Sequence, residues 1–298
     1  MRNFSDKWLA ATQRCRFADD WPDWSGPRMP VVPWVVPPMF PAARRIFLEQ
    51  GEIREYESGE PICPNIQVRH FIYVLSGLTG RVAATLEGQT GASMALSPPG
   101  RLATGNLNFN SGRPAIGRYL ALTKTKCLVI SHDSVRESIW KARPEYLRQC
   151  FTYSEIINLT DRMAFAVMGL LPAMDRLKSV LLAWALYYGT LSDDNGKLHV
   201  TMPAPCRNQN LADMISASSV TIDKLFADLK NNHGFRRKSD FISFEVDALQ
   251  DLHTWMRRAD GEDAKPQRPK WVADMLIAAQ EERTMRPDEL PEAHRRSL

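Results

Sequence analysis

The stretch from Asn208 to Leu229 gathers hydroxyl, small apolar and cationic side chains on one helical face. Its second half repeats apolar residues at the i, i+3, i+4, i+7 spacing of a half-buried helix, at Ile222, Leu225, Phe226 and Leu229. The opposite face then carries Ser219, Val220, Asp223, Lys224 and Ala227. A hydroxyl can bond either base type, a valine can pack on a thymine methyl, and a lysine can reach a base or a phosphate. This face is therefore suited to contact DNA.

A shorter helix comes first, with Leu211, Ala212 and Ile215 on its buried face. Ser216–Ala217–Ser218 breaks the pattern, and Ser218 can cap the second helix by accepting a backbone N–H. Two short helices of this kind are typical of a DNA-reading helix-turn-helix, although an ordinary helical hairpin would share the apolar spacing. We predict these DNA-binding residues: Ser218, Ser219, Val220, Thr221 and Lys224.

A basic hairpin is expected directly after these helices. The segment GFRRKSDFISFEV, residues 234–246, predicts two strands around a turn at 238–240. It places Arg236, Arg237 and Lys238 near Lys230. Phosphate contacts fall on such a wing, although a solvated surface turn would look similar. We predict that Arg236, Arg237 and Lys238 bind the DNA backbone.

Composition permits a DNA-binding role without arguing for it. The 298 residues suit two domains with appendages, and the net charge is only +4. No apolar run approaches the ~20 residues of a membrane span, and the N-terminus lacks the apolar region of a secretory signal. The five cysteines are scattered, which favours reduced thiols in the cytoplasm. The histidines show no metal-binding spacing, so we expect no metal and no cofactor.

The N-terminal half is predicted to be an arm followed by β-structure. Residues 1–40 mix tryptophans with closely spaced prolines, which prevents regular helix and favours an extended arm packed on a folded body. Its indoles, Trp34 among them, could instead line a ligand site. One or two helical turns are expected at Ala42–Gln50. From Glu52 to Ser131, short alternating runs separated by glycines predict an antiparallel roll or barrel that ends in one long strand, 120–131.

A long helix is predicted to begin near Pro144, after a short helix at Ser134–Lys141. Along it, residues at alternating spacings of four and three form a seam: Tyr146, Cys150, Tyr153, Ile157, Thr160, Ala164, Val167 and Leu171. Such a seam predicts a partner helix, most simply the same helix of a second subunit, whereas a helix buried in its own domain would show the same pattern.

Further elements are expected on either side of the two short helices. Asp175–Tyr188 predicts an apolar helix stopped by Gly189, and Leu198–Met202 predicts an edge strand. The C-terminal region predicts one amphipathic piece, Trp271–Glu282, with its apolar face formed by Trp271, Met275, Leu276 and Ala279.

This order of parts resembles the Crp/Fnr superfamily of bacterial transcription regulators over roughly residues 38–252. The landmarks are GEPI at 59–62, YVLSG at 73–77, PPG at 98–100 and DRL at 175–177. Within the family, GEIREYESG and VTMP look most similar to the branch that senses halogenated phenols.

The resemblance implies an α+β fold with an N-terminal antiparallel β-roll of the cyclic-nucleotide-binding kind and a C-terminal winged helix-turn-helix. The implied divisions are an arm (1–40), the roll (41–135), a dimerisation helix (136–172), the DNA-binding domain (173–250) and an extension (251–298). It also implies a homodimeric, effector-controlled regulator that is not an enzyme. Its partners would be a double-stranded DNA operator and, for an activator, RNA polymerase.

The chain departs from the family at both sites. Where the family often has Arg–Glu at the start of its reading helix, this chain has Ser219 and Val220, which predicts a different operator. Cyclic-nucleotide members use Gly–Glu–Leu, whereas residues 105–107 are Gly–Asn–Leu. The resemblance therefore implies a small aromatic or anionic effector rather than a cyclic nucleotide, bound by Asn106, Leu107, Arg113, Arg118 and Tyr153. Tyr153 could also be a simple packing residue.

Two other functions fit parts of the sequence. A catalytic β-barrel of the cupin kind would need a His/Glu metal set that the expected strands lack. A degenerate regulator would bind DNA or a protein partner without any small ligand. Iron–sulfur sensing is disfavoured because only Cys15 lies near the N-terminus. Haem sensing is disfavoured because residues 105–121 contain no Cys or His.

Overall fold

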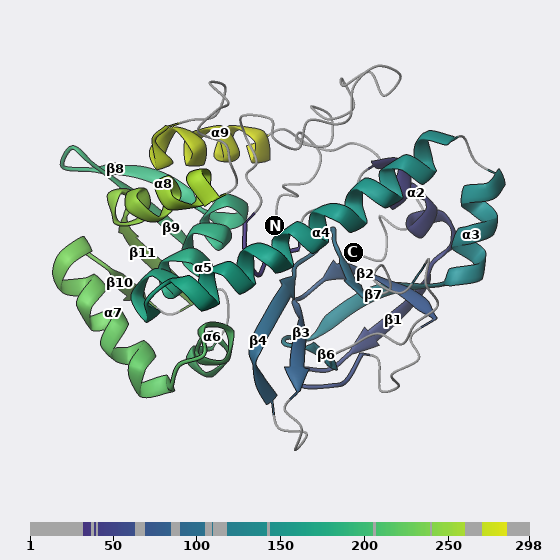
Figure 1. The fold of residues 1–298 in the computed structure, drawn as a ribbon, viewed down its shortest axis with the longest axis horizontal. Helices are drawn as coiled ribbons and strands as arrows, with labels where there is room; N and C mark the ends of the chain where they lie inside the picture. The colour runs from purple at the N-terminus through teal and green to yellow at the C-terminus, as the bar shows by residue number, and fades with distance from the viewer. Residues whose placement is uncertain are drawn as a thin grey trace.

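The computed structural model shows a mixed α+β chain in which a long helix, α4 (Pro144–Leu170), connects two groups of elements. It describes residues 32–36, 39, 41–62, 69–84, 90–104, 109, 118–141, 144–204, 207–238, 240–259 and 270–284. Figure 1 shows α4 running over one group of strands, β1–β7, toward a second group that contains β8–β11. We call the strands β1–β7 the roll.

The roll consists of two antiparallel sheets packed face to face. The first has the order β1-β7-β2-β5 and the second β4-β3-β6. The bounds are β1 Glu52–Tyr56, β2 His70–Ser76, β3 Thr79–Ala84, β4 Thr90–Ser97, β5 Leu102–Thr104, β6 Arg118–Ala121 and β7 Thr125–Ser131. Side chains from both sheets form one buried cluster that includes Ile72, Val74, Tyr119, Ala121 and Val129. The predicted antiparallel strands are confirmed.

The single strand expected over residues 120–131 is wrong. Strand β6 ends at Ala121, β7 begins at Thr125, and the two belong to different sheets. Between them the backbone N–H groups of Leu122 and Thr123 both donate to the carbonyl of Leu78, at 2.8 and 3.4 Å. The chain turns there from one sheet to the other, and the apolar alternation on both sides carries no mark of that change.

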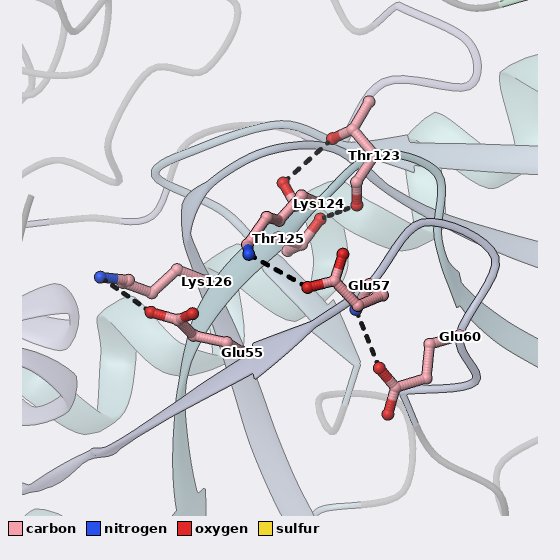
Figure 2. Close-up of polar contacts among 7 residues, drawn as sticks. All are labelled: Glu55, Glu57, Glu60, Thr123, Lys124, Thr125 and Lys126. Carbon is pink, nitrogen blue, oxygen red and sulfur yellow. Dashed lines mark hydrogen bonds and ion pairs between the residues drawn. The ribbon is translucent and has the colours of Figure 1, made fainter.

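Strand β1 is the outer strand of its sheet, and its side chains are almost all exposed. Figure 2 shows two ion pairs beside it, Glu57 with Lys124 at 3.0 Å and Glu55 with Lys126 at 3.1 Å. Glu60 accepts from the backbone N–H of Glu57 at 2.8 Å. The hydrogen bond with Glu57 raises the pKa of Lys124. Exposed pairs like these add little to stability because solvent screens them.

Residues 32–36 of the arm lie along the outer side of β4. Val35 pairs with Leu96 in a parallel bridge. The N–H of Leu96 donates to the carbonyl of Trp34 at 2.5 Å, and the N–H of Val36 donates to the carbonyl of Leu96 at 2.9 Å. Trp34 is only 1% exposed and has a φ of +60°, which L residues rarely adopt. The prediction that the arm packs on the folded body is confirmed for these residues.

Four helices join the two groups: α2 (Pro41–Gln50) and α3 (His132–Lys141), which both pack on β7, and then α4 and α5 (Ala173–Tyr188). Each matches a predicted helix to within a few residues. α4 packs on α2, α3 and α5. Leu177, Val180, Leu181 and Leu186 of α5 are fully buried.

The predicted dimer seam of α4 is wrong, because this single chain already buries it. Tyr153, Ile157, Ala164 and Val167 are each less than 9% exposed and belong to the main core, together with residues of α2, α5 and the arm. The side chains of Tyr146 and Cys150 lie outside the described residues. A different face of α4 is exposed, and its large apolar side chains are Phe151, Leu159, Phe165 and Leu170.

The second group contains a four-stranded antiparallel sheet with the order β10-β11-β9-β8. Its strands are β8 (Thr190–Asp194), β9 (Lys197–Pro203), β10 (Arg236–Lys238) and β11 (Phe241–Glu245). The expected edge position of residues 198–202 is wrong, because β9 lies between β11 and β8. Strand β8 was not expected, although Asn195–Gly196, with φ values of +56° and +78°, is a typical hairpin signal.

Two short helices, α6 (Asn208–Ile215) and α7 (Ser219–His233), complete this group with a 3₁₀ turn, η1 (Val246–Leu249). The C-terminal extension contributes two more helices, α8 (Gln250–Ala259) and α9 (Val272–Thr284), of which only the second was predicted. α9 packs on α5 and β8, and its Gln280 Oε1 accepts from the N–H of Leu191 at 2.6 Å. Trp271, expected on the buried face, is 63% exposed. Across the described segments, no helix has the length and apolarity needed to cross a bilayer.

Candidate nucleic-acid interface and effector region

The turn between α6 and α7 is fixed by two local features. Ser216 takes a left-handed conformation with a φ of +51°, and the N–H of Ala217 donates to the carbonyl of Ala212 at 2.9 Å. Ser218 then caps α7, because its Oγ accepts from the N–H of Thr221 at 3.0 Å. The predicted capping role of Ser218 is confirmed. Its Oγ also lies 2.8 Å from Thr221 Oγ1, so both hydroxyls take part in the cap.

The exposed face of α7 carries the side chains that the sequence placed there. Ser219, Val220, Asp223, Lys224 and Ala227 are exposed, with Val220 at 62%. Ile222 and Leu229 are buried, while Leu225 and Phe226 are half-buried. The predicted division of α7 into a packed face and a free face is confirmed. The DNA contacts assigned to the free face remain predictions.

The hairpin of β10 and β11 also lies where it was predicted, and all three residues of β10 are exposed. Its cations differ in their surroundings. Arg236 Nη1 lies 3.7 Å from Asp194 Oδ2 on β8. Arg237 Nη1 donates to Asn208 Oδ1 at 2.8 Å. Each guanidinium carries five N–H donors, so both side chains can keep these contacts and still meet a phosphate.

A groove of about 510 Å³ lies between α7 and β10. Its lining combines apolar and charged side chains: Asn208, Asp223, Phe226, Ala227, Lys230, Phe235, Arg236 and Arg237. Phe226 and Phe235 stack within it, with ring centroids 4.7 Å apart and planes 15° apart. The groove therefore has an aromatic component and three cations, a combination that suits an anionic polymer.

Asn208 joins the parts of this surface, and sequence reasoning missed it. Its Nδ2 donates to Asp223 Oδ1 on α7 at 2.9 Å, while its Oδ1 accepts from Arg237 on β10. One side chain at the start of α6 therefore connects the free face of α7 to the hairpin. Only its position as the first residue of α6, close to α7, could have suggested this role.

The predicted effector residues are only partly described. Asn106, Leu107 and Arg113 lie outside the described residues, as does the side chain of Arg118, whose backbone begins β6. Tyr153 lies on the buried face of α4 and is 2% exposed. Its hydroxyl oxygen accepts from the N–H of Leu102 at 3.3 Å. Burial raises the pKa of Tyr153 well above its usual value, so it remains a neutral phenol at physiological pH.

Arg101 is a buried cation at the same junction, and sequence reasoning missed it. It is 2% exposed; its Nε donates to the carbonyl of Val36 at 2.8 Å and its Nη1 to that of Pro99 at 2.5 Å. Its guanidinium also stacks over the ring of Tyr187 on α5, 4.4 Å from the centroid. Burial raises the pKa of Tyr187, and the neighbouring Arg101 opposes that shift. Arg101 thus joins the arm, the roll and α5.

A second contact joins the roll directly to α4. Arg81 on β3 forms an ion pair and hydrogen bond with Asp161 on α4, and both side chains are about 20% exposed. This ion pair would therefore transmit a displacement of the roll to α4. Among the residues that the structure describes, no group of three or more His, Cys, Asp and Glu side chains is arranged to hold a metal ion.

Comparison with known proteins identifies the fold. No protein-family model and no curated protein sequence matches the chain. Solved structures do match it at low sequence identity. CprK complexed with OCPA has a TM-score of 0.53 and 15% identity over 72% of this chain and 95% of its own.

Two further regulators match to a similar extent. FixK2 from Bradyrhizobium japonicum has a TM-score of 0.55 and 14% identity over 65% of this chain and 92% of its own. The c-di-GMP responsive global regulator CLP from Xanthomonas campestris has a TM-score of 0.54 and 15% identity over 68% of this chain and 98% of its own. The chain thus has the fold of Crp/Fnr-family transcription regulators, as its sequence landmarks indicated.

Proposed function

We propose that the chain is a homodimeric transcription regulator that binds DNA through a winged helix-turn-helix. In this proposal α6 and α7 form the helix-turn-helix and the β10–β11 hairpin is the wing. The observation that carries it is the free face of α7, which is bordered by exposed cations on a fold shared with transcription regulators. Ser219, Val220 and Lys224 would meet base edges, and Arg236, Arg237 and Lys238 would meet phosphates.

We propose a separate role for each part of the chain. The roll (41–135) would house an effector, α4 within 136–172 would carry the dimer interface, and 173–250 would read DNA. The extension (251–298) includes α8 and α9, and α9 packs on α5, so we assign it a supporting role for the DNA-reading part.

Selection of duplexes from a random pool by the full-length protein tests DNA reading. A two-fold symmetric site is expected, with half-sites about one helical turn, ~34 Å, apart. Footprinting on the selected site should show protection of both halves. A protein that enriches no sequence, or that protects a single half-site as a monomer, would contradict the proposal.

The free apolar face of α4 supports the dimer. Phe151, Leu159, Phe165 and Leu170 are 47, 37, 68 and 72% exposed. Phe151 and Phe165 lie two heptads apart on the helix, as residues of a coiled-coil seam do. A second copy of α4 packed against this face would bury all four side chains in each subunit. The proposed interface therefore replaces the seam of Tyr153, which faces the chain's own core.

We also propose that a small aromatic anion, rather than a cyclic nucleotide, controls the protein by binding between the roll and α4. Support comes from the amide of Asn106 in place of a carboxylate, and from Tyr153 where the roll meets the helix. Arg113 and Arg118 would pair with the anion. Calorimetry with cyclic AMP, cyclic GMP and a panel of aromatic acids and phenols tests this. Micromolar cyclic-nucleotide binding that depends on Arg113 would overturn it.

The packing at the junction favours a second candidate, a regulator that needs no ligand. Tyr153 and Arg101 are buried and hydrogen-bonded within the chain itself. Thermal unfolding separates the two candidates, because a ligand specific to the native state must raise its stability. Stabilisation by any member of the aromatic panel supports the effector-controlled regulator, and its absence across the panel supports the ligand-free one.

A further inference from the structure

We propose that Asp223 reads the amino group of a cytosine in the operator and is positioned for this by Asn208 and Arg237. The inference rests on the proposed DNA-binding function and names a specificity-determining residue for it. Asp223 lies on the free face of α7, one turn after Ser219 and directly before Lys224. Side chains in the N-terminal half of a reading helix are the ones that reach base edges.

The carboxylate of Asp223 is held on one side and open on the other. Its Oδ1 accepts from Asn208 Nδ2 at 2.9 Å, and the residue is exposed and borders the groove between α7 and β10. An ionised carboxylate offers about four acceptor positions, so one bond to Asn208 leaves acceptor capacity facing outward. The Asn208 amide therefore orients the Asp223 carboxylate and leaves acceptor positions for a base.

The negative charge of Asp223 favours contact with a hydrogen-bond donor on a base over contact with a phosphate. Lys230, Arg236 and Arg237 border the same groove, and a DNA phosphate drawn to them would be repelled by a carboxylate. In the major groove, cytosine presents its N4 amino group, which Asp and Glu accept from. Adenine also has an amino group there, but its neighbouring N7 is an acceptor and opposes a carboxylate. Guanine and thymine present acceptors at the equivalent position, so cytosine is the base that fits.

Asn208 and Arg237 make the recognition of cytosine by Asp223 depend on the β10–β11 hairpin. Arg237 Nη1 donates to Asn208 Oδ1 at 2.8 Å, so the orientation of the amide is set from β10 and passed to Asp223 on α7. Asn208 is therefore a positioning residue, and Arg237 acts in part through it. Removing the side chain of Asn208 or of Arg237 should reduce the preference for cytosine, although the carboxylate of Asp223 remains.

The test uses the full-length protein and the operator that it selects from a random pool. Competition binding is measured for every single-base change in one half-site with the unaltered protein, Asp223→Asn, Asn208→Ala and Asp228→Asn. Asp228 is the matched control, because it is exposed on the same helix but does not line the groove. Both aspartate variants lose one negative charge, so a general gain in affinity for DNA should be alike in the two.

The unaltered protein should prefer cytosine at one position by about 10- to 100-fold. Asp223→Asn should lose this preference and favour adenine, because an amide pairs with adenine N6 and N7. Asn208→Ala should weaken the preference and leave the other positions unchanged. A duplex that carries 2-pyrimidinone, which lacks the amino group, should bind Asp223→Asn and Asp228→Asn nearly alike, because Asp223 then has no donor to accept from.

Two results would overturn the inference. One is an Asp223→Asn profile that matches those of the unaltered protein and Asp228→Asn at every position. The other is a uniform loss of affinity in Asp223→Asn and Asn208→Ala with base preferences intact, which would show a purely structural role. If the unaltered protein enriches no sequence at all, the proposed DNA-binding function itself fails.

Discussion

Replacement of Phe165 by alanine tests the proposal that the exposed face of α4 joins two subunits. Phe165 is 68% exposed in the single chain, and full burial of a phenylalanine contributes about 1.5–3 kcal/mol. Covering its exposed part is therefore worth roughly 1–2 kcal/mol, and a two-fold symmetric dimer covers it twice. Phe165→Ala should weaken dimerisation by roughly 2–4 kcal/mol, which raises the dimer Kd about 30- to 1000-fold.

Analytical ultracentrifugation over a range of concentrations measures this constant. Val167→Ala is the matched control, because Val167 lies on the same helix but is fully buried in its own chain. It should lower the free energy of unfolding by roughly 1–3 kcal/mol and leave the dimer Kd unchanged. The opposite pattern, with Val167→Ala dissociating the dimer and Phe165→Ala having no effect, would refute the assignment of the faces.

Three further changes test the proposed DNA-binding parts and the cap of α7. Lys224→Ala should weaken binding to the selected operator by about 1–3 kcal/mol and relax specificity at its position, as measured by competition binding. Lys238→Ala should weaken binding to all sequences alike and reduce the slope of log K against log salt by about one, as measured by titrations at several salt concentrations. Ser218→Ala should cost about 1 kcal/mol of unfolding free energy because Thr221 loses its capping acceptor, whereas Ser218→Gly should cost only a few tenths, as measured by urea denaturation.

Local signals explain which parts of the fold could be predicted. The α6–α7 pair was found because its apolar spacing and its capping serine both lie within a short stretch of sequence. Strand β8 was missed although Asn195–Gly196 marks the turn that follows it, because its sequence, TLSDD, carries a single apolar residue. In α8 the charged residues concealed a helix whose Leu252 and Met256 are buried.

The α4 seam shows where periodicity is insufficient. A heptad pattern predicts that a face is buried, but it does not identify the surface that buries it. Here the chain's own core covers Tyr153 and Val167, and the exposed face is a second one that includes Phe151 and Phe165.

In the candidate site, too, some features could be predicted from local sequence and others could not. Exposure on α7 follows from spacing within one helix, so Ser219, Val220 and Lys224 were placed correctly. The bonds from Asn208 to Asp223 and Arg237 depend on how three elements meet, which no local pattern encodes.

The bond between Gln280 and Leu191 has a consequence for how the chain behaves during synthesis and storage. Strand β8 ends its sheet, and an uncovered outer strand can recruit a strand from another molecule. Helix α9 covers this side, and Gln280 occupies a backbone N–H that a foreign strand would need. Because α9 lies well after β8 in the chain, β8 stays open to strand addition until α9 has been made and has folded. A chain cut after Ala259 should therefore aggregate by intermolecular strand pairing even where α6, α7 and the β10–β11 hairpin are folded.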